Sequence, residues 1–195
     1  MNERHTQLRS NLLITVTSVL LSATSLVRAA DQKPIETYTA FAASLGTGRT
    51  AIVDLRVTRW STDQEREMLL TTLQEFGRER LLSALEKLPP VGTIRTSNSI
   101  GYDLYYAREH KEADGSRRVF LATNRPVSFR ELLNNTRSKD FQFTLIELRL
   151  GPDGKGEGKL VPAAKVSWDK DAKRIEIENY SALPVDLLQV TANNP

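Results

Sequence analysis

His110 carries the most versatile side chain for chemistry in this sequence, because general-base catalysis and nucleophile activation most often depend on an imidazole. It lies in a run of charged residues, REHKE over 108–112, just before the turn signal Asp114-Gly115. The other histidine, His5, lies in the expected leader, so a serine nucleophile would need His110 as its base, and the chain holds no Gly-x-Ser-x-Gly elbow. A zinc site would need more such ligands, and the chain has no cysteine. We therefore interpret His110 as an exposed residue of a hairpin.

Glu176 and Glu178 are two carboxylates that alternate along the segment RIEIENY, so they share one face of an expected strand and Ile175 and Ile177 share the other. Paired carboxylates are the groups that carry out glycoside hydrolysis. Arg174 lies on the same face, however, which is typical of a solvated, ion-paired surface. We interpret this face as exposed.

A second acidic segment, GPDGKGEG over 151–158, is weakly similar to a calcium loop, because Asp153 and Glu157 alternate with glycines. Calcium takes about six to eight oxygen ligands at fixed spacing. Here Lys155 occupies one such position, and the bidentate glutamate of a calcium loop is missing downstream. The segment also lacks the Gly-Lys-Ser/Thr ending of a phosphate loop. We interpret it as a glycine-rich hairpin turn.

Three tyrosines, Tyr102, Tyr105 and Tyr106, gather on one expected strand, with Phe120 on its hairpin partner. Alternation along a strand places Tyr102 and Tyr106 on one face and Tyr105 on the other. Burial in a core accounts for one of these faces, and the other leaves open an aromatic platform that faces a ligand. From all these patterns we predict no catalytic, cofactor-binding or metal-binding residue, and we leave the ligand-binding residues unassigned.

The elements that must position these residues are mostly β-strands. Val53, Leu55 and Val57 alternate with polar residues and predict a half-buried strand that ends near Trp60. Further strands are expected wherever β-branched and aromatic residues are enriched, at 92–96, 102–109, 117–124, 141–150, 157–167, 173–180 and 185–190. The turn signals between them are Asp114-Gly115, Asp153-Gly154 and the polar segment 169–172.

One block of helical periodicity follows the first strand. Thr62 and Glu65 have the spacing of a capping box and predict a helix start. Apolar residues then recur at helical spacing as far as Gly77, and a second apolar stripe ends at Pro89-Pro90. The two stripes are Met68, Leu69, Leu70, Leu73 and Phe76, and Leu81, Leu82, Leu85 and Leu88. We expect a helical hairpin or a kinked helix here, and a short helical turn near 128–134.

These elements predict the α+β class. Consecutive strands joined by tight turns give an antiparallel sheet, and one helical block covers only part of it. We therefore expect a curled antiparallel β-sheet or open barrel of about seven to eight strands, with one helical hairpin or kinked helix packed on it. The predicted limits are a signal peptide over 1–29, an irregular N-terminal segment over 30–49 and a single α+β domain over 50–191.

The first 29 residues have the three-part pattern of an export signal. Arg4 and Arg9 precede an uncharged run over 10–27, and Val27-Arg28-Ala29 places short residues where signal peptidase reads. A membrane anchor of about 20 residues is the alternative, which the many serines and threonines of the run disfavour. A lipid anchor needs a cysteine thiol, and there is none. We expect a periplasmic or secreted protein with no stable membrane anchor after cleavage.

The balance of charge argues against a nucleic-acid partner. The full chain carries 27 basic and 24 acidic residues, and loss of 1–29 removes three arginines but one glutamate, which leaves it close to neutral. Basic and acidic residues are interleaved along the sequence, whereas nucleic-acid-binding proteins usually gather basic residues on one face.

Four stretches of the chain are distinctive in combination: GYDLYYAR, RRVFLATNRPVSF, FTLIELRLGPDGKGEGKL and IEIENY. Together they resemble a group of small exported bacterial proteins to which no activity is assigned, and the resemblance covers roughly residues 50–190. It implies bacterial export and one domain. It does not identify a ligand, a cofactor or a catalytic residue for any position of this chain.

The function we expect is that of a non-enzymatic binding or interaction module, without a cofactor, whose partner is a small apolar ligand or a protein. The alternative is a hydrolase that uses carboxylates inside a cavity of the sheet. A cavity with facing carboxylates would favour the hydrolase, a dry apolar cavity would favour ligand carriage, and a filled core would favour a protein-interaction role.

Overall fold

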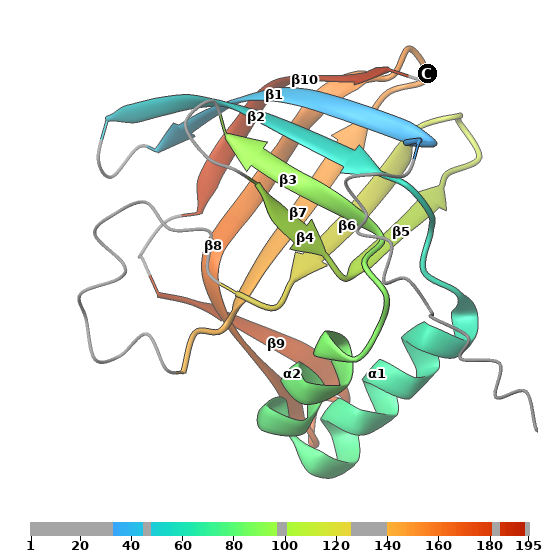
Figure 1. The fold of residues 1–195 in the computed structure, drawn as a ribbon, viewed down its shortest axis with the longest axis vertical. Helices are drawn as coiled ribbons and strands as arrows, with labels where there is room; N and C mark the ends of the chain where they lie inside the picture. The colour runs from blue at the N-terminus through green and yellow to red at the C-terminus, as the bar shows by residue number, and fades with distance from the viewer. Residues whose placement is uncertain (1–32, 45–47, 97–100, 126–139, 181–183, 194–195) are drawn as a thin grey trace, which may run out of the picture.

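The computed structural model describes residues 33–44, 48–96, 101–125, 140–180 and 184–193. In this part of the chain, ten strands form one antiparallel sheet with two helices packed beside it (Figure 1). The helices are α1 (Asp63–Phe76) and α2 (Arg78–Glu86). The strands are β1 (Glu36–Ser44), β2 (Arg49–Val57), β3 (Gly92–Thr96), β4 (Tyr102–Leu104), β5 (Tyr106–Lys111), β6 (Arg117–Thr123), β7 (Phe143–Leu150), β8 (Lys155–Asp169), β9 (Arg174–Asn179) and β10 (Val185–Asn193). The predicted α+β class and antiparallel sheet are confirmed.

The sheet curls until its two edges nearly meet. Its strand order is β4-β3-β2-β1-β10-β8-β7-β6-β5, and β9 pairs with β8 outside this path. β4 pairs with β3, and the chain then continues directly into β5, which pairs with β6. Across this junction the Tyr105 amide donates to the Ala122 carbonyl at 2.9 Å, and the Ser61 amide donates to the Ala107 carbonyl at 2.8 Å. The result is a nearly closed, barrel-like sheet, called the barrel below.

The strand count exceeds the seven to eight strands expected from the sequence, for two reasons. First, β1 forms at Glu36–Ser44, inside the segment 30–49, so the expectation of an irregular segment is wrong there. Its buried apolar positions, Tyr38, Ala40 and Ala42, include two small residues, while Phe41 is exposed, so hydrophobicity does not reveal the alternation. Second, the expected strand 102–109 divides at Tyr105, because the chain changes its pairing partner there from β3 to β6.

The interior of the barrel is filled by apolar side chains. Val53, Leu55 and Val57 face inward, as their alternation predicted, and each is almost completely buried. Inward positions of neighbouring strands meet in the same way around the barrel. The largest of the other buried members of this core are Tyr38, Ile94, Leu104, Leu121, Leu148, Leu150 and Leu187.

The helices begin and end where the sequence predicted. The Glu65 amide donates to the Thr62 hydroxyl at 3.1 Å, and the Thr62 amide donates to the Glu65 carboxylate at 2.8 Å, which completes the capping box of α1. Gly77 separates the two helices with a φ of 78°, a conformation that side chains disfavour. The predicted apolar stripes are only partly buried, because Met68 and Phe76 are exposed.

A second apolar cluster joins the helices to the outside of the barrel. It consists of Leu69, Leu73 and Leu85 from the helices with Phe143, Ala164 and Val166 from β7 and β8. β8 continues beyond the barrel toward this cluster, and β9 pairs with its second half, so the helices and the β8–β9 hairpin lie at the same end of the molecule (Figure 1). This arrangement brings two helices, one hairpin and the outer face of the barrel together.

The predicted turns are confirmed at three places. Gly115 and Gly154 adopt positive φ angles of 84° and 73° between paired strands. In the third turn, the Asp169 carboxylate accepts hydrogen bonds from the Asp171 and Ala172 amides. The expected leader over 1–29 and the expected helical turn near 128–134 lie outside the described residues.

Candidate functional site

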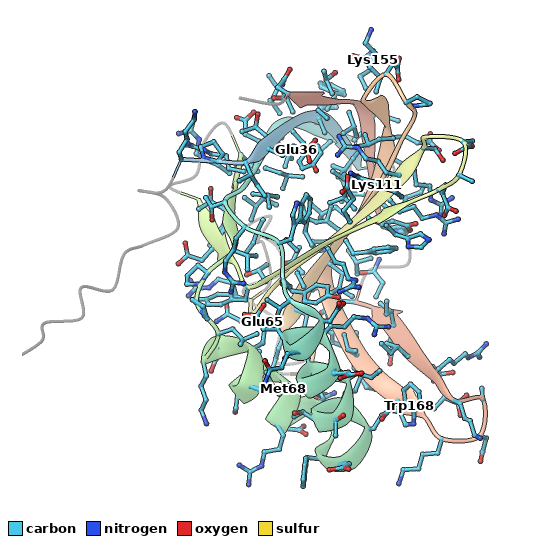
Figure 2. The ribbon with its side chains drawn as sticks, turned by 90° about the vertical axis from the view of Figure 1, so that its right-hand side faces the viewer. Glu36, Glu65, Met68, Lys111, Lys155 and Trp168 are labelled. Atoms are coloured by element: carbon cyan, nitrogen blue, oxygen red, sulfur yellow. The ribbon has the colours of Figure 1, made fainter. Side chains whose placement is uncertain are left out.

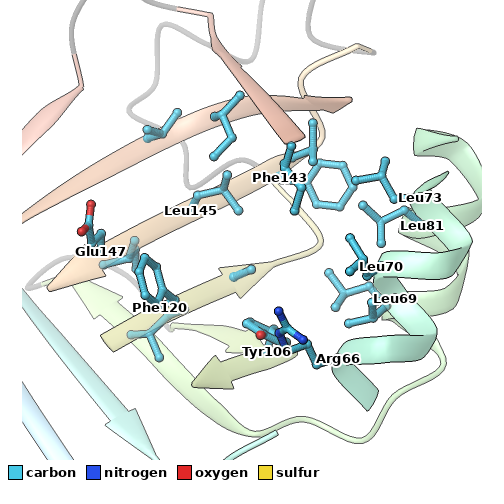
Figure 3. Close-up of a pocket in the computed structure, with 18 of the residues that line it drawn as sticks. Arg66, Leu69, Leu70, Leu73, Leu81, Tyr106, Phe120, Phe143, Leu145 and Glu147 are labelled. Carbon is cyan, nitrogen blue, oxygen red and sulfur yellow. The ribbon is translucent and has the colours of Figure 1, made fainter. Parts of the chain in front are cut away.

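An apolar cavity of about 410 Å³ lies between the two helices and the outer face of the barrel. Figure 3 shows leucines of α1 and α2 on one side of it, with Tyr106 of β5 beside α1, and Phe120 of β6 with Leu145 and Glu147 of β7 on the other side. Small-molecule sites in proteins commonly have volumes of roughly 300–1,000 Å³. The cavity is therefore large enough for a small ligand.

Cross-strand register builds the floor of this cavity on the outer face of the barrel. Each floor residue pairs with its neighbour on the next strand, so side chains far apart in sequence form rows. The intervening residues, such as Leu148 and Leu160, point into the barrel core. One row is Tyr106, Ala122, Leu145 and Val161, and the next row is Phe120, Glu147 and Lys159.

The walls of the cavity come from the helices and from β9. The helical wall consists of Leu69, Leu70, Leu73, Leu81 and Leu85. β9 contributes Ile175 and Ile177, which are 48% and 55% exposed. The sequence predicted that these two isoleucines share a strand face, and the structure confirms this and turns that face toward the cavity. Burial of a bound apolar molecule would cover this exposed surface.

The charged residues of the lining differ in whether they have ionic partners. Glu147 forms an ion pair with Arg149, with 3.0 Å between the carboxylate Oε1 and Nε. The Lys159 ammonium group forms an ion pair with the Asp186 carboxylate. Arg66, on α1, lines the cavity and forms no ion pair within the described part of the chain. Figure 3 shows Arg66 and Tyr106 beside the helices and Glu147 on the far side of the lining.

Tyr106 adds a polar group to an otherwise apolar row. Burial raises the pKa of its hydroxyl, and the positive charges of Arg108 and Arg66 oppose this rise. The hydroxyl therefore stays protonated at neutral pH. Among the described residues it has no hydrogen-bond partner, so it remains free to donate to a ligand.

A separate polar cluster lies at the opposite end of the barrel, where Figure 2 labels Glu36 and Lys111. The Arg117 guanidinium holds both oxygens of the Glu36 carboxylate, at 2.5 and 3.0 Å, and one oxygen of Glu109 at 2.7 Å. The Tyr38 hydroxyl donates to Glu36 at 2.6 Å. Burial, followed by this hydrogen bond, raises the pKa of Tyr38 far above its ordinary value. Each charge of this cluster is matched by a partner, which is typical of a structural ion pair.

The structure places the candidate residues from the sequence at the surface. The side chain of His110 is 67% exposed, and its Nε2 lies 3.6 Å from the Glu112 carboxylate. Glu178 forms an ion pair with Lys165 at 3.0 Å, and Glu176 forms one with Arg174 at 3.4 Å. The predicted exposed hairpin residue and the predicted ion-paired face are thus confirmed.

The glycines of GPDGKGEG have structural roles. Gly154 forms the turn, but Gly156 and Gly158 belong to β8, so the segment is only partly a turn. A Cβ atom on Gly156 would lie 1.9 Å from the Arg149 carbonyl oxygen, and one on Gly158 would lie 2.5 Å from that of Glu147. Close approach of β7 to β8 therefore requires these glycines.

The sequence left open an aromatic platform that faces a ligand. In the structure, Tyr106 and Phe120 are the aromatic residues of β5 and β6 that line the cavity. Tyr102, which we expected on the same face as Tyr106, packs instead against the barrel core. The reason is the break at Tyr105, which ends the regular alternation between β4 and β5.

Sequence reasoning missed most of the cavity residues, including Arg66, Leu145 and Val161. The helical stripes and the aromatic residues were visible, but their meeting across four strands depends on register, which a single sequence does not show. Arg66 carried one local signal, because it is a basic residue in the first turns of a helix, where acidic residues are favoured.

No family model, curated protein or solved structure matches this chain. Among the described residues, no helix is long and apolar enough to cross a membrane. The same residues contain no group of three or more histidine, cysteine or acidic side chains that could hold a metal ion.

Proposed function

We propose that this protein is an exported, non-enzymatic binding protein that holds a small apolar ligand in the cavity between its helices and its barrel. The observation that carries this proposal is the cavity itself, about 410 Å³ in volume and lined by leucine, isoleucine, valine and aromatic side chains. Ligand sites of this kind are mostly apolar, with a few polar groups that fix orientation. Arg66 and Tyr106 are such groups here.

The interior of the barrel is occupied by its own side chains, the outcome that we expected to favour a protein-interaction role. The proposal of a small ligand therefore rests on the apolar cavity on the outer face of the barrel. The helices contribute leucines and β9 contributes isoleucines to the lining of this space. Apolar surface that a protein leaves uncovered in a hollow is stabilised when a ligand removes it from water.

The lining gives less support to the hydrolase that the sequence left open. Glycoside hydrolysis of the common type requires two carboxylates on either side of the substrate. Of the described residues that line the cavity, Glu147 carries the one carboxylate, and Arg149 already holds it in an ion pair. The cavity therefore favours binding over this chemistry.

A neutral apolar fluorophore tests the proposal directly. N-phenyl-1-naphthylamine should bind the protein expressed from its full sequence saturably and one to one, with the blue-shifted, enhanced emission of a dry site. Leu145→Trp places a larger side chain on the cavity floor and should weaken this binding at least about tenfold, because it fills the volume that the fluorophore needs.

Leu188→Trp is the matched control, because Leu188 is an exposed leucine on β10 that does not line the cavity. It should leave the affinity for the fluorophore within about twofold of the wild-type value. Thermal unfolding of both variants would show that each is folded. Absence of saturable binding by the wild-type protein, or equal effects of the two substitutions, would contradict the proposal.

A further inference from the structure

Arg66 is a cation without a local structural role. It occupies the fourth helical position of α1, near the positive end of the helix dipole, where a basic side chain is mildly unfavourable. The acidic residue three positions before it, Asp63, is already paired with Arg108 at 2.7 Å. Three and four positions after it come Leu69 and Leu70, which cannot offset its charge.

The other charges around the cavity are matched. Glu65 beside the helix start holds Arg59, with 2.9 Å between carboxylate and guanidinium. Glu147 holds Arg149, and Lys159 holds Asp186. Among the described residues that line the cavity, Arg66 is therefore the one charged side chain that no ion pair matches.

The Tyr106 hydroxyl is a second donor at the same place. The charge of Arg66 acts on this hydroxyl, and both side chains line the cavity beside α1 (Figure 3). A guanidinium and a neutral hydroxyl together offer several donors and no charged acceptor. Such a pair suits an anionic oxygen group, which a guanidinium can bind in a bidentate manner.

We propose that the ligand is an anionic amphiphile, an aliphatic chain that ends in a carboxylate, with the chain in the apolar cavity and the carboxylate on Arg66 and the Tyr106 hydroxyl. This inference rests on the proposed function, because it assigns the class of ligand to the same cavity. The leucines and isoleucines of the walls contact the chain, and Arg66 selects the charge of the head group.

Three ligands of equal chain length distinguish the contribution of the head group to affinity from that of the chain. Dodecanoate, dodecanol and dodecylamine, each below its micelle concentration, should displace N-phenyl-1-naphthylamine from the full-length protein. We expect dodecanoate to bind about tenfold more tightly than dodecanol, and dodecylamine to bind more weakly than dodecanol, because their chains are equivalent and only the head-group charge differs.

Arg66→Gln should reduce the ratio of dodecanoate to dodecanol affinity from about tenfold to within about twofold. Arg66→Lys, which keeps the charge but loses the bidentate geometry, should retain part of the ratio. Arg80→Gln is the matched control, because Arg80 is an exposed arginine on α2 that does not line the cavity. It should leave the ratio at its wild-type value.

The outcomes separate the two proposals. Equal affinities for dodecanoate and dodecanol in the wild-type protein, or an unchanged ratio in Arg66→Gln, would overturn the anionic ligand and leave an apolar binding site in place. Failure of all three compounds to displace the fluorophore, together with no saturable fluorophore binding, would overturn both.

Discussion

Arg117 is held between the carboxylates of Glu36 and Glu109. Figure 2 labels Glu36 at the end of the barrel away from the helices. Its side chain is 18% exposed and that of Glu36 only 6%, so both charges are largely removed from water. A buried ion pair of this kind contributes little net stability compared with apolar residues, but removal of one partner leaves a costly uncompensated charge.

We therefore expect Arg117→Met to lower the free energy of unfolding by about 3–5 kcal/mol. Arg149→Met removes an ion-paired arginine that is mostly exposed and should cost less than about 1 kcal/mol. Urea denaturation of the two variants at neutral pH would measure the difference. Similar midpoints for both would show that the Glu36–Arg117 pair is not buried in solution.

Tyr38 makes the stability of the protein sensitive to alkaline pH. Burial and the hydrogen bond to Glu36 raise the pKa of its hydroxyl in the folded state, whereas in the unfolded chain the hydroxyl ionises near pH 10. A raised folded-state pKa contributes stability that is fully present below pH 10 and is lost as pH rises above that value. Between the unfolded-state and folded-state pKa values, one such group lowers the free energy of unfolding by about 1.4 kcal/mol per pH unit.

Tyr38→Phe should therefore show a shallower fall in unfolding free energy above pH 10 than the wild-type protein. At neutral pH the same variant should be less stable by about 1.5–3 kcal/mol, because it loses a hydrogen bond to a charged group. Chemical denaturation at a series of pH values would give both quantities. Parallel curves for the two proteins above pH 10 would contradict the burial of this hydroxyl.

At the scale of elements, Leu85 is the buried residue of α2. This side chain is 3% exposed and belongs to the cluster that joins the helices to the barrel, whereas Leu82 is only partly buried. Because Leu85 also borders the cavity, its removal enlarges a space that is already empty. The apolar stripe in the sequence did not distinguish these two leucines.

We expect Leu85→Ala to lower the free energy of unfolding by about 2–3 kcal/mol, at the lower end of the usual range for buried leucines, and Leu82→Ala by clearly less. Urea midpoints measured under identical conditions would compare the two. An equal loss in both variants would mean that Leu82 is as closely packed as Leu85.

Elements with a local signal could be predicted from the sequence. The capping box of α1, the alternation of Val53, Leu55 and Val57, and the Asp-Gly turns each depend on residues within a few positions of one another. β1 could not be predicted, because two of its buried positions, Ala40 and Ala42, are small residues and Phe41 between them is exposed, so the strand shows no clear alternation of hydrophobicity.

The cavity could be predicted only in fragments. The sequence showed the leucines of the helices, the two isoleucines of β9 and the aromatic residues near Tyr106. Their convergence depends on the pairing of Leu145 with both Ala122 and Val161, and on the length of β8, which continues beyond the barrel. These are long-range properties, so the ligand site emerges only when the strands are assembled.

At the scale of the whole molecule, the N-terminal signal predicts a processed protein. We expect export followed by cleavage after Ala29, because short residues at Val27 and Ala29 follow the apolar run. Intact-mass measurement of protein recovered from the periplasm or the medium would locate the new N-terminus. Recovery of chains that begin at Met1, or recovery only with membranes, would contradict this expectation.

The packed barrel and the hollow beside it also divide the molecule into parts of different local stability. Most strands of the barrel are hydrogen-bonded to a neighbouring strand on each side, and together they enclose a filled core. In contrast, β9 pairs with β8 alone, and the helices border the cavity. Amide protons of α1, α2 and β9 should therefore exchange with solvent through local openings, well before those of β1, β7 and β10. A ligand in the cavity should slow exchange in the first group and leave the second almost unchanged, so hydrogen exchange would reveal occupancy even when the ligand carries no optical signal.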